Sequence, residues 1–243
     1  MTAWSDRDWP ALDEGEILIG WLDLERVVTD EELEWLAPAE HARAARFAFD
    51  RDRQRFIAGR AAVRHALARQ TGKAPKDLAL HAGPHGKPYL ADAGDLSFNL
   101  THSGSTGLLA ISRGAEIGVD LERVTLPADP HAIAGSVFTP EERRLLQSVP
   151  KAQLAQAFFT CWTLKEACLK AVGTGMSIDP REVHMGMGRY SGQDEAEVSI
   201  GTSTIAARTI VENENWIASL AVIGAMKSHR VVNPLHSTAN ILN

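Results

Sequence analysis

The sequence predicts a fold of mixed helices and antiparallel strands, arranged as two similar halves. A long helix followed by short strands is expected twice, with the helices at 50–71 and 154–172. The strand sequences GLLAIS at 107–112 and IASLAVI at 217–223 are weakly alike, which indicates a duplicated unit.

The two halves are expected to divide at a stretch interrupted by prolines near 123–130. We therefore predict an N-terminal half over 1–123 and a C-terminal half over 124–228. Residues 229–243 match no helix or strand pattern and are predicted to form a loose tail.

Capping residues delimit several shorter elements. Thr29 and Glu32 form the pattern of a capping box, and Pro38 suits the first turn of another helix. Thr139 and Glu142 repeat the capping pattern, which competes with any metal or catalytic role for Glu142. The predicted strands lie at 16–23, 95–100, 107–112, 116–122, 198–200, 204–211 and 216–223.

Composition excludes several classes of protein. The chain has 243 residues, of which 44% are hydrophobic and 23% charged, as in soluble globular proteins. Its net charge of −6 argues against nucleic-acid binding over the whole surface. No apolar run approaches the ~20 residues of a membrane helix. The polar, acidic N-terminus is unlike a signal peptide.

Two cysteines, Cys161 and Cys168, fall in one predicted helix. At ~1.5 Å rise per residue their Cα atoms lie roughly 10 Å apart, beyond the reach of a disulfide. We expect free thiols, which fits a reducing cytoplasm.

Positive charge is concentrated in residues 41–76, where ten basic and two acidic residues give a local net charge of +8. Such a segment suits an anionic ligand or an acidic partner. A solvated helix face is the alternative for any single arginine.

The segment Ile117–Glu122 (IGVDLE) has a strand pattern with two carboxylates on one face. Ile117, Val119 and Leu121 would face a core, while Gly118, Asp120 and Glu122 face the other way. Adjacent carboxylates repel each other and need a cation or a raised pKa. The arrangement suits Mg²⁺; a solvated polar face on an edge strand is the alternative.

Trp162, Glu166 and Lys170 lie at helical spacing and predict one stripe on the second long helix. A glutamate beside bulky apolar groups can serve as a metal ligand or as a base. The alternative is an ordinary surface pair of Glu166 and Lys170.

Thr101, His102 and Ser103 are predicted to lie on a turn that follows a strand, where they could bind phosphate oxygens. A Ser–His–Asp hydrolase built from Ser103, His102 and Asp120 is disfavoured, because adjacent side chains on an extended chain point apart. Lys87, in the loop sequence Gly86-Lys87-Pro88, could also bind phosphate or could be a solvated loop lysine.

Taken together and in their order along the chain, six short motifs resemble those of the phosphopantetheinyl transferases of the Sfp type. The matching sequences are RFIAGR (55–60), GKP (86–88), FNLTHSG (98–104), IGVDLE (117–122), FTPEE (138–142) and WTLKEACLKAVGTG (162–175). The resemblance implies an α+β fold of two halves related by a pseudo-twofold, with the active site at the seam.

The resemblance also implies an activity. Such enzymes move the 4′-phosphopantetheine arm of coenzyme A to a serine of an acyl or peptidyl carrier protein and release adenosine 3′,5′-bisphosphate. The carriers belong to fatty-acid, polyketide or nonribosomal-peptide synthases. A monomer is expected, because two halves of one chain form the seam.

Site residues follow from the resemblance, position by position. Asp120, Glu122 and Glu166 match the metal-binding carboxylates, with Mg²⁺ expected and Mn²⁺ as an alternative. Glu166 and Lys170 match catalytic positions, Glu166 as general base towards the carrier serine. The positions that match coenzyme A-binding residues are Arg55, Lys87, Thr101, His102 and Lys170. Thr101 stands where serine is common and keeps the hydroxyl.

Two other functions use the same residues. A Mg²⁺-dependent pyrophosphate hydrolase would cleave coenzyme A with water, and a non-catalytic module would only bind it. The set Asp120, Glu122, Glu166 and Lys170 argues against the binding module.

Overall fold

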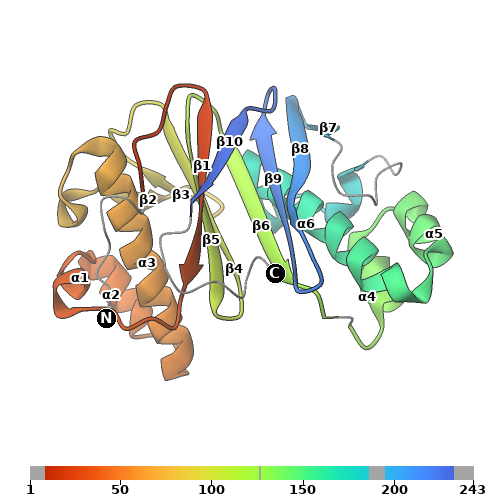
Figure 1. Ribbon diagram of the computed structural model, residues 1–243, viewed down its shortest axis with the longest axis horizontal. Helices are drawn as coiled ribbons and strands as arrows, with labels where there is room; N and C mark the ends of the chain where they lie inside the picture. The colour runs from red at the N-terminus through yellow and green to blue at the C-terminus, as the bar shows by residue number, and fades with distance from the viewer. Residues whose placement is uncertain (1–8, 126, 186–194, 233–243) are drawn as a thin grey trace.

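The computed structural model describes residues 9–125, 127–185 and 195–232. Helices flank a central pair of sheets on both sides (Figure 1). The first half contains β1 (Glu16–Asp23), α1 (Asp30–Glu34), α2 (Pro38–Ala44), α3 (Asp50–Thr71), β2 (Leu80–Ala82), β3 (Pro88–Leu90), β4 (Leu96–Ser103) and β5 (Thr106–Arg113). Next come β6 (Ile117–Arg123), α4 (Pro130–Val137), α5 (Pro140–Ser148), α6 (Leu154–Val172), β7 (Ala196–Ile200), β8 (Ser203–Glu212), β9 (Trp216–Ile223) and β10 (Ser228–Val232).

The two long helices begin and end where the sequence predicts. Gly72 and Gly173 cap α3 and α6 at φ values of 71° and 75°, the left-handed region that glycine enters without a steric penalty. The capping boxes of Thr29 with Glu32 and of Thr139 with Glu142 are both present.

Both halves repeat one topology. The first sheet has the order β10-β1-β5-β4 and the second β6-β9-β8-β7. In each half a first strand is followed by a long helix, and an antiparallel pair then returns to that strand: β1, α3 and β4–β5, against β6, α6 and β8–β9. The weakly similar sequences form β5 and β9, the central strands. The prediction of an α+β fold with two similar halves is confirmed.

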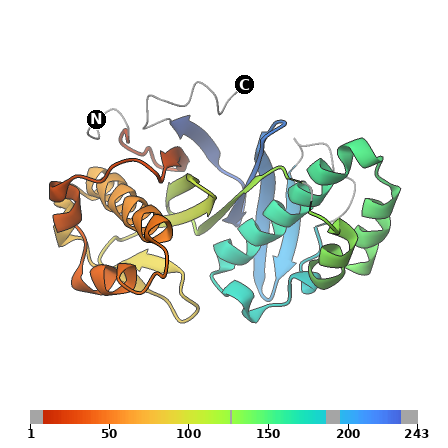
Figure 2. The ribbon, with the colours of Figure 1, turned by 90° about the horizontal axis from the view of Figure 1, so that it is seen from below.

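The sheets pack on each other and each carries a helix on its outer face. Val63 and Leu67 of α3 join Leu109 of β5 in the first outer core. Ala167 of α6 joins Ala221 of β9 in the second. Between the sheets lies a shared core of Ile17, Ile19, Trp21, Leu108, Ala110, Ile117, Val119, Leu121, Ala218, Leu220 and Val222. Seen from below, α3 and α6 lie on opposite sides of the strands (Figure 2).

Two strands differ from the division that the sequence suggested. The strand 117–123, which we assigned to the N-terminal half, pairs with β9 in the second sheet. The start of the expected tail at 229–243 belongs to β10, which runs parallel to β1 in the first sheet. Residues 233–243 lie outside the described residues.

The turn expected at Thr101, His102 and Ser103 is not a turn, because β4 continues to Ser103. Ser103 pairs with Thr106 of β5, and Gly104, at a φ of 62°, makes the tight connection. The helix α4 was not predicted; it begins at Pro130 with Asp129 as its N-cap.

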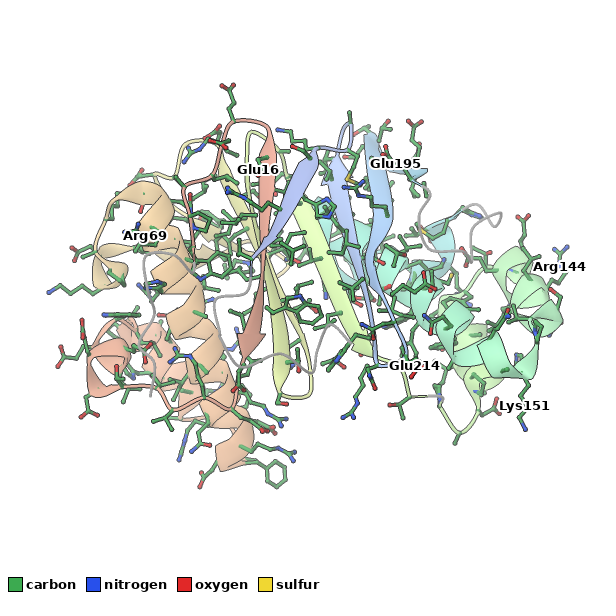
Figure 3. All side chains as sticks on the ribbon, in the orientation of Figure 1. Glu16, Arg69, Arg144, Lys151, Glu195 and Glu214 are labelled. Carbon is green, nitrogen blue, oxygen red and sulfur yellow. The ribbon has the colours of Figure 1, made fainter. Side chains whose placement is uncertain are left out.

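Charged side chains occupy the outer surfaces of the helical layers. Arg144 of α5 and Lys151 lie at the outer edge of the second half, away from the sheets (Figure 3). Within the described residues, no helix combines the length and apolar character needed to cross a membrane.

Candidate active site at the seam between the halves

The site is built where α6 crosses β6. A Cβ placed on Gly118 would lie 2.1 Å from the carbonyl oxygen of Ala167 and 2.4 Å from the amide nitrogen of Ala171. Only a glycine allows a helix backbone this close to the strand. The face of β6 that carries Asp120 is thus covered by α6, and the alternative of a solvated edge-strand face is wrong for this residue.

Asp120 is buried and makes contacts with both halves. Its Oδ1 accepts hydrogen bonds from Thr101 Oγ1 at 3.0 Å and from Lys170 Nζ at 2.5 Å. Its Oδ2 is also buried and has no hydrogen-bond partner among the described residues. Burial raises the pKa of Asp120, although Lys170 and Thr101 act against the rise.

Glu122 lies two residues further along the same face. Its Oε2 accepts a hydrogen bond from Ser103 Oγ at 2.8 Å, and Trp162 of α6 lies close enough to the carboxylate to lower its pKa. Partial burial raises the pKa of Glu122, and the negative charge of Asp120 contributes in the same direction.

The predicted stripe along α6 is formed by Trp162, Glu166 and Lys170. All three side chains are only partly buried, whereas most other residues of this helix are buried. Partial burial raises the pKa of Glu166, opposed by Lys170 and assisted by Asp120 and Glu122. The Lys170 ammonium bonds to Asp120 and to Thr101 Oγ1 rather than simply pairing along the helix.

His102 and Arg55 lie on the first half's side of the seam. His102 points to the opposite side of β4 from Thr101, as strand alternation requires, and is exposed. Partial covering of the ring and the charges of Lys170 and Arg55 lower the pKa of His102. Arg55 is paired with Glu25. These three basic side chains are therefore within electrostatic reach of one another.

Lys87 is held at the other end of the seam. Its Nζ donates to Glu116 Oε2 at 2.7 Å, to the carbonyl of Ile117 at 3.2 Å and to the carbonyl of Ala171 at 2.9 Å. The ammonium thus ties the loop before β3 to β6 and to the end of α6. The structure gives Lys87 a linking role that the sequence did not suggest.

The basic segment 41–76 is partly structural. Arg60 and Arg64 both pair with Glu40, and Arg64 is fully buried, where it also bonds to two backbone carbonyls. These two arginines fix α2 and the segment after α3 against the middle of α3 instead of facing a ligand.

Glu142 is more than a helix cap. Besides its capping bonds, it accepts a hydrogen bond from the backbone of Met185 at 3.2 Å and pairs with Lys165 at 2.7 Å, with both side chains buried. Lys165 also donates to the carbonyls of Pro180 and Val183. The pair lies within the second half and secures the chain after α6.

Sequence reasoning missed the role of alternate residues of β4. Ser97, Asn99, Thr101 and Ser103 bond respectively to Glu116, the amide of Val119, Asp120 and Glu122. Their alternation in a strand was a usable signal, since period-two polar residues share one face. Their partners, 19 or 20 residues away, could not be read from the sequence.

The carboxylates of Asp120, Glu122 and Glu166 suit a divalent cation whose remaining coordination positions are filled by oxygens of a bound ligand. Asp120 Oδ2 is a buried oxygen without a partner among the described residues, and partial burial, assisted by neighbouring negative charge, raises the pKa of Glu122 and Glu166. In the described part of the chain, no three His, Cys, Asp or Glu side chains converge closely enough to hold a metal by themselves. Mg²⁺ characteristically uses one or two carboxylates and completes its shell with water and phosphate oxygens.

The thiols of Cys161 and Cys168 are free and buried, as predicted. Burial raises the pKa of the Cys168 thiol to about 12, so it is not a nucleophile at neutral pH.

Comparison with known proteins identifies the family. Residues 116–220 match the 4′-phosphopantetheinyl transferase superfamily, and residues 27–113 match the N-terminal part of a 4′-phosphopantetheinyl transferase. The 4′-phosphopantetheinyl transferase HetI of Nostoc is 34% identical over 78% of this chain and 79% of its own. A Synechocystis protein that is also named as a 4′-phosphopantetheinyl transferase is 42% identical to this chain. The match covers 58% of each of the two chains, which is little more than half of that relative.

A holo-(acyl-carrier-protein) synthase of Bacillus anthracis, solved in complex with coenzyme A, matches 46% of this chain and 96% of its own. Its TM-score of 0.39 and identity of 17% are too low to support an argument. The relationship rests on the sequence matches to both halves and on HetI. The chain therefore belongs to the 4′-phosphopantetheinyl transferase family.

Proposed function

We propose that this protein transfers the 4′-phosphopantetheine arm of coenzyme A to a serine of an acyl or peptidyl carrier protein and releases adenosine 3′,5′-bisphosphate. One observation carries the proposal: Asp120 of β6, Thr101 of β4 and Lys170 of α6 meet at the seam, beside Glu122 and Glu166. Acidic and basic groups of the second half thus meet a hydroxyl of the first half, in a site that offers groups for both a pyrophosphate and a cation.

The acidic residues suit a divalent cation. Asp120, Glu122 and Glu166 would hold Mg²⁺, or alternatively Mn²⁺, together with pyrophosphate oxygens. When bound, the ion supplies charge neutralisation as the phosphorus–oxygen bond breaks. The buried, unpartnered Oδ2 of Asp120 supports this assignment.

Glu166 is the proposed general base. The carrier serine oxygen forms a bond to the phosphorus that bears the pantetheine arm, and the bond from that phosphorus to the oxygen of adenosine bisphosphate breaks. The serine proton passes to Glu166, since a hydroxyl is a weak nucleophile unless a base removes its proton.

Basic side chains are proposed to bind the phosphates of coenzyme A. Lys170 lies beside Asp120, and Arg55 and His102 belong to the first half, with His102 within electrostatic reach of Lys170. The Thr101 hydroxyl is already hydrogen-bonded to Asp120 and Lys170, so it would contact coenzyme A while keeping these two partners. Lys87 would have to exchange one of its three acceptors for a phosphate.

The protein is further proposed to act as a monomer, because one chain contributes residues from both halves to the site. Light scattering coupled to gel filtration tests this, with one chain per particle as the expected result. The mass expected for that particle is 26.4 kDa.

Intact-mass spectrometry of a purified apo carrier protein tests the function. The carrier is incubated with this protein, coenzyme A and Mg²⁺, with and without EDTA. The expected result is a gain of one phosphopantetheine arm that EDTA suppresses. Consumption of coenzyme A without loading of several fatty-acid and peptide carriers would instead support a pyrophosphate hydrolase. Intact coenzyme A with no loading would contradict both reactions.

A further inference from the structure

Glu122 receives a hydrogen bond from a residue that belongs to the other half of the protein. Ser103, the last residue of β4, donates from Oγ to Glu122 Oε2 at 2.8 Å. The same Oγ accepts the backbone N–H of Arg123 at 3.1 Å. One serine therefore fixes both the side chain of Glu122 and the backbone that follows it.

The direction of this bond is determined. A hydroxyl has one proton, and a backbone N–H can only donate. The Arg123 N–H donates to a lone pair of Ser103 Oγ, and the ionised carboxylate of Glu122, which can only accept, receives the serine proton. Ser103 thus supports Glu122 as an acceptor.

The same arrangement occurs one step earlier along the two strands. Thr101 Oγ1 donates to Asp120 Oδ1 at 3.0 Å and accepts from Lys170 Nζ at 3.0 Å. In both acids one carboxylate oxygen is bonded to a β4 hydroxyl, and in Asp120 the other is buried without a partner. The hydroxyls of β4 therefore determine which carboxylate oxygen stays available to a ligand.

We propose that Ser103 is a positioning residue that orients the Glu122 carboxylate from the opposite half of the protein. It acts through Glu122, to which its hydroxyl donates. The effect on turnover rests on the proposed transfer reaction, whereas the effect on cation binding rests only on the proposed cation site. Residues that orient metal-binding carboxylates typically contribute 10–100-fold to metal affinity or activity.

Three variants separate this role from a contribution to folding. Ser103→Ala removes the hydroxyl. Ser103→Thr keeps it in a β-branched residue, which a strand accommodates well, as Thr101 shows in the same strand. Ser105→Ala is the matched control, because Ser105 lies in the adjoining turn and its hydroxyl has no bonded partner among the described residues.

Three measurements are made on each variant. Carrier loading gives kcat, KM for coenzyme A and the Mg²⁺ concentration at half-maximal rate. Calorimetric titration of EDTA-treated protein with Mn²⁺, in the presence of coenzyme A and without carrier, gives cation affinity independently of turnover. Thermal unfolding reports whether each variant is folded.

Ser103→Ala is expected to weaken Mn²⁺ binding about 10-fold or more and to raise the Mg²⁺ requirement similarly, with KM for coenzyme A changed less than about 3-fold. Ser103→Thr should restore both values to within about 3-fold of the parent, and Ser105→Ala should match the parent. Unchanged Mn²⁺ affinity in folded Ser103→Ala would overturn the proposal, as would equal losses in Ser103→Ala and Ser103→Thr. If the parent loads no carrier, the proposed function fails, and the Mn²⁺ titration still decides the role of Ser103.

Discussion

Buried charged residues in this protein differ in how completely they are partnered. The ammonium of Lys165 contacts Glu142 and two carbonyl oxygens, and Glu142 has a further backbone donor in Met185. Asp120, in contrast, retains a buried oxygen with no partner in the described chain. A fully satisfied pair serves the fold, whereas an incompletely satisfied carboxylate is available to a ligand.

Removing Lys165 should therefore destabilise the protein without any direct effect on the site. Lys165→Met leaves the Glu142 carboxylate buried without its cation, which typically costs 3–5 kcal/mol. Urea denaturation should show this loss in the free energy of unfolding. The double variant Lys165→Met/Glu142→Gln should recover a large part of it, because a neutral glutamine needs no cation and still completes a capping box. No recovery would show that the ion pair is not the source of the loss.

Changing the proposed base, Glu166, should lower activity without lowering stability. Glu166→Gln keeps the size of a half-buried side chain but cannot accept the serine proton, so kcat should fall about 10²–10⁴-fold. Binding of coenzyme A, followed by calorimetry, should persist, and the melting temperature should not fall. Glu141→Gln is a matched control on an exposed helix face and should retain parental kcat. Undiminished transfer by Glu166→Gln would exclude its role as base.

At the scale of elements, the contact of α6 with β6 depends on Gly118. A Cβ there would lie 2.1 Å from a backbone oxygen of α6, which cannot move independently of the helix. Gly118→Ala must therefore shift α6 away from β6, and with it Lys170 away from Asp120. Overpacking of this kind typically costs 1–3 kcal/mol. We expect lower stability in urea together with a loss of carrier loading.

Gly135→Ala provides the control for Gly118→Ala. Gly135 lies within α4, and a Cβ there would meet no atom within 4 Å. Alanine is favoured over glycine in a helix by about 1 kcal/mol, so this variant should be as stable as the parent or more so. If Gly118→Ala behaved like Gly135→Ala, the close approach of α6 would not be a constraint on the site.

Local patterns predicted elements better than their partners. Gly72, Gly173 and the two capping boxes marked helix ends correctly, because those signals act within one or two turns of chain. The strand 117–123 was recognised as a strand but placed in the wrong half. Its sequence sets which side chains share a face and does not specify β9, about a hundred residues later, as its neighbour.

For the candidate site, too, the sequence predicted the residues better than their contacts. Asp120, Glu122, Glu166 and Lys170 were identified from motifs, and the structure brings Lys170 onto Asp120. The linking bonds of Lys87 and the partners of Ser103 depend on long-range packing and could not be deduced from spacing. Sequence alone also could not separate arginines such as Arg64, buried against Glu40, from arginines free to meet a ligand.

At the scale of the whole molecule, the two halves are joined by side chains along facing strand edges. β4 ends one sheet and β6 ends the other. The N–H groups of Val119 and Arg123 donate to Asn99 Oδ1 and Ser103 Oγ of β4, instead of to backbone carbonyls. The edge of β6 is thus satisfied by side chains of β4, and the same contacts align the acidic residues of the site.

Asn99 is the test of this joint between the halves. Asn99 Oδ1 accepts the Val119 N–H at 2.9 Å in a buried position directly before Asp120. Asn99→Ala would leave that N–H buried without an acceptor, at a typical cost of 1–3 kcal/mol. We expect lower stability in urea and, because Asp120 follows Val119, slower carrier loading.

Asn99→Asp separates the hydrogen bond from the volume of the side chain. Aspartate keeps an acceptor for the Val119 N–H but adds a negative charge near Asp120 and Glu122, so the two acids are more difficult to ionise together. This variant should keep more stability than Asn99→Ala at neutral pH only if the acceptor outweighs the repulsion. Asn215→Ala serves as the control, since its exposed side chain lies in the β8–β9 turn, away from β4. If Asn99→Ala were as stable and as active as Asn215→Ala, side chains of β4 would not be what holds β6 and its acids in place.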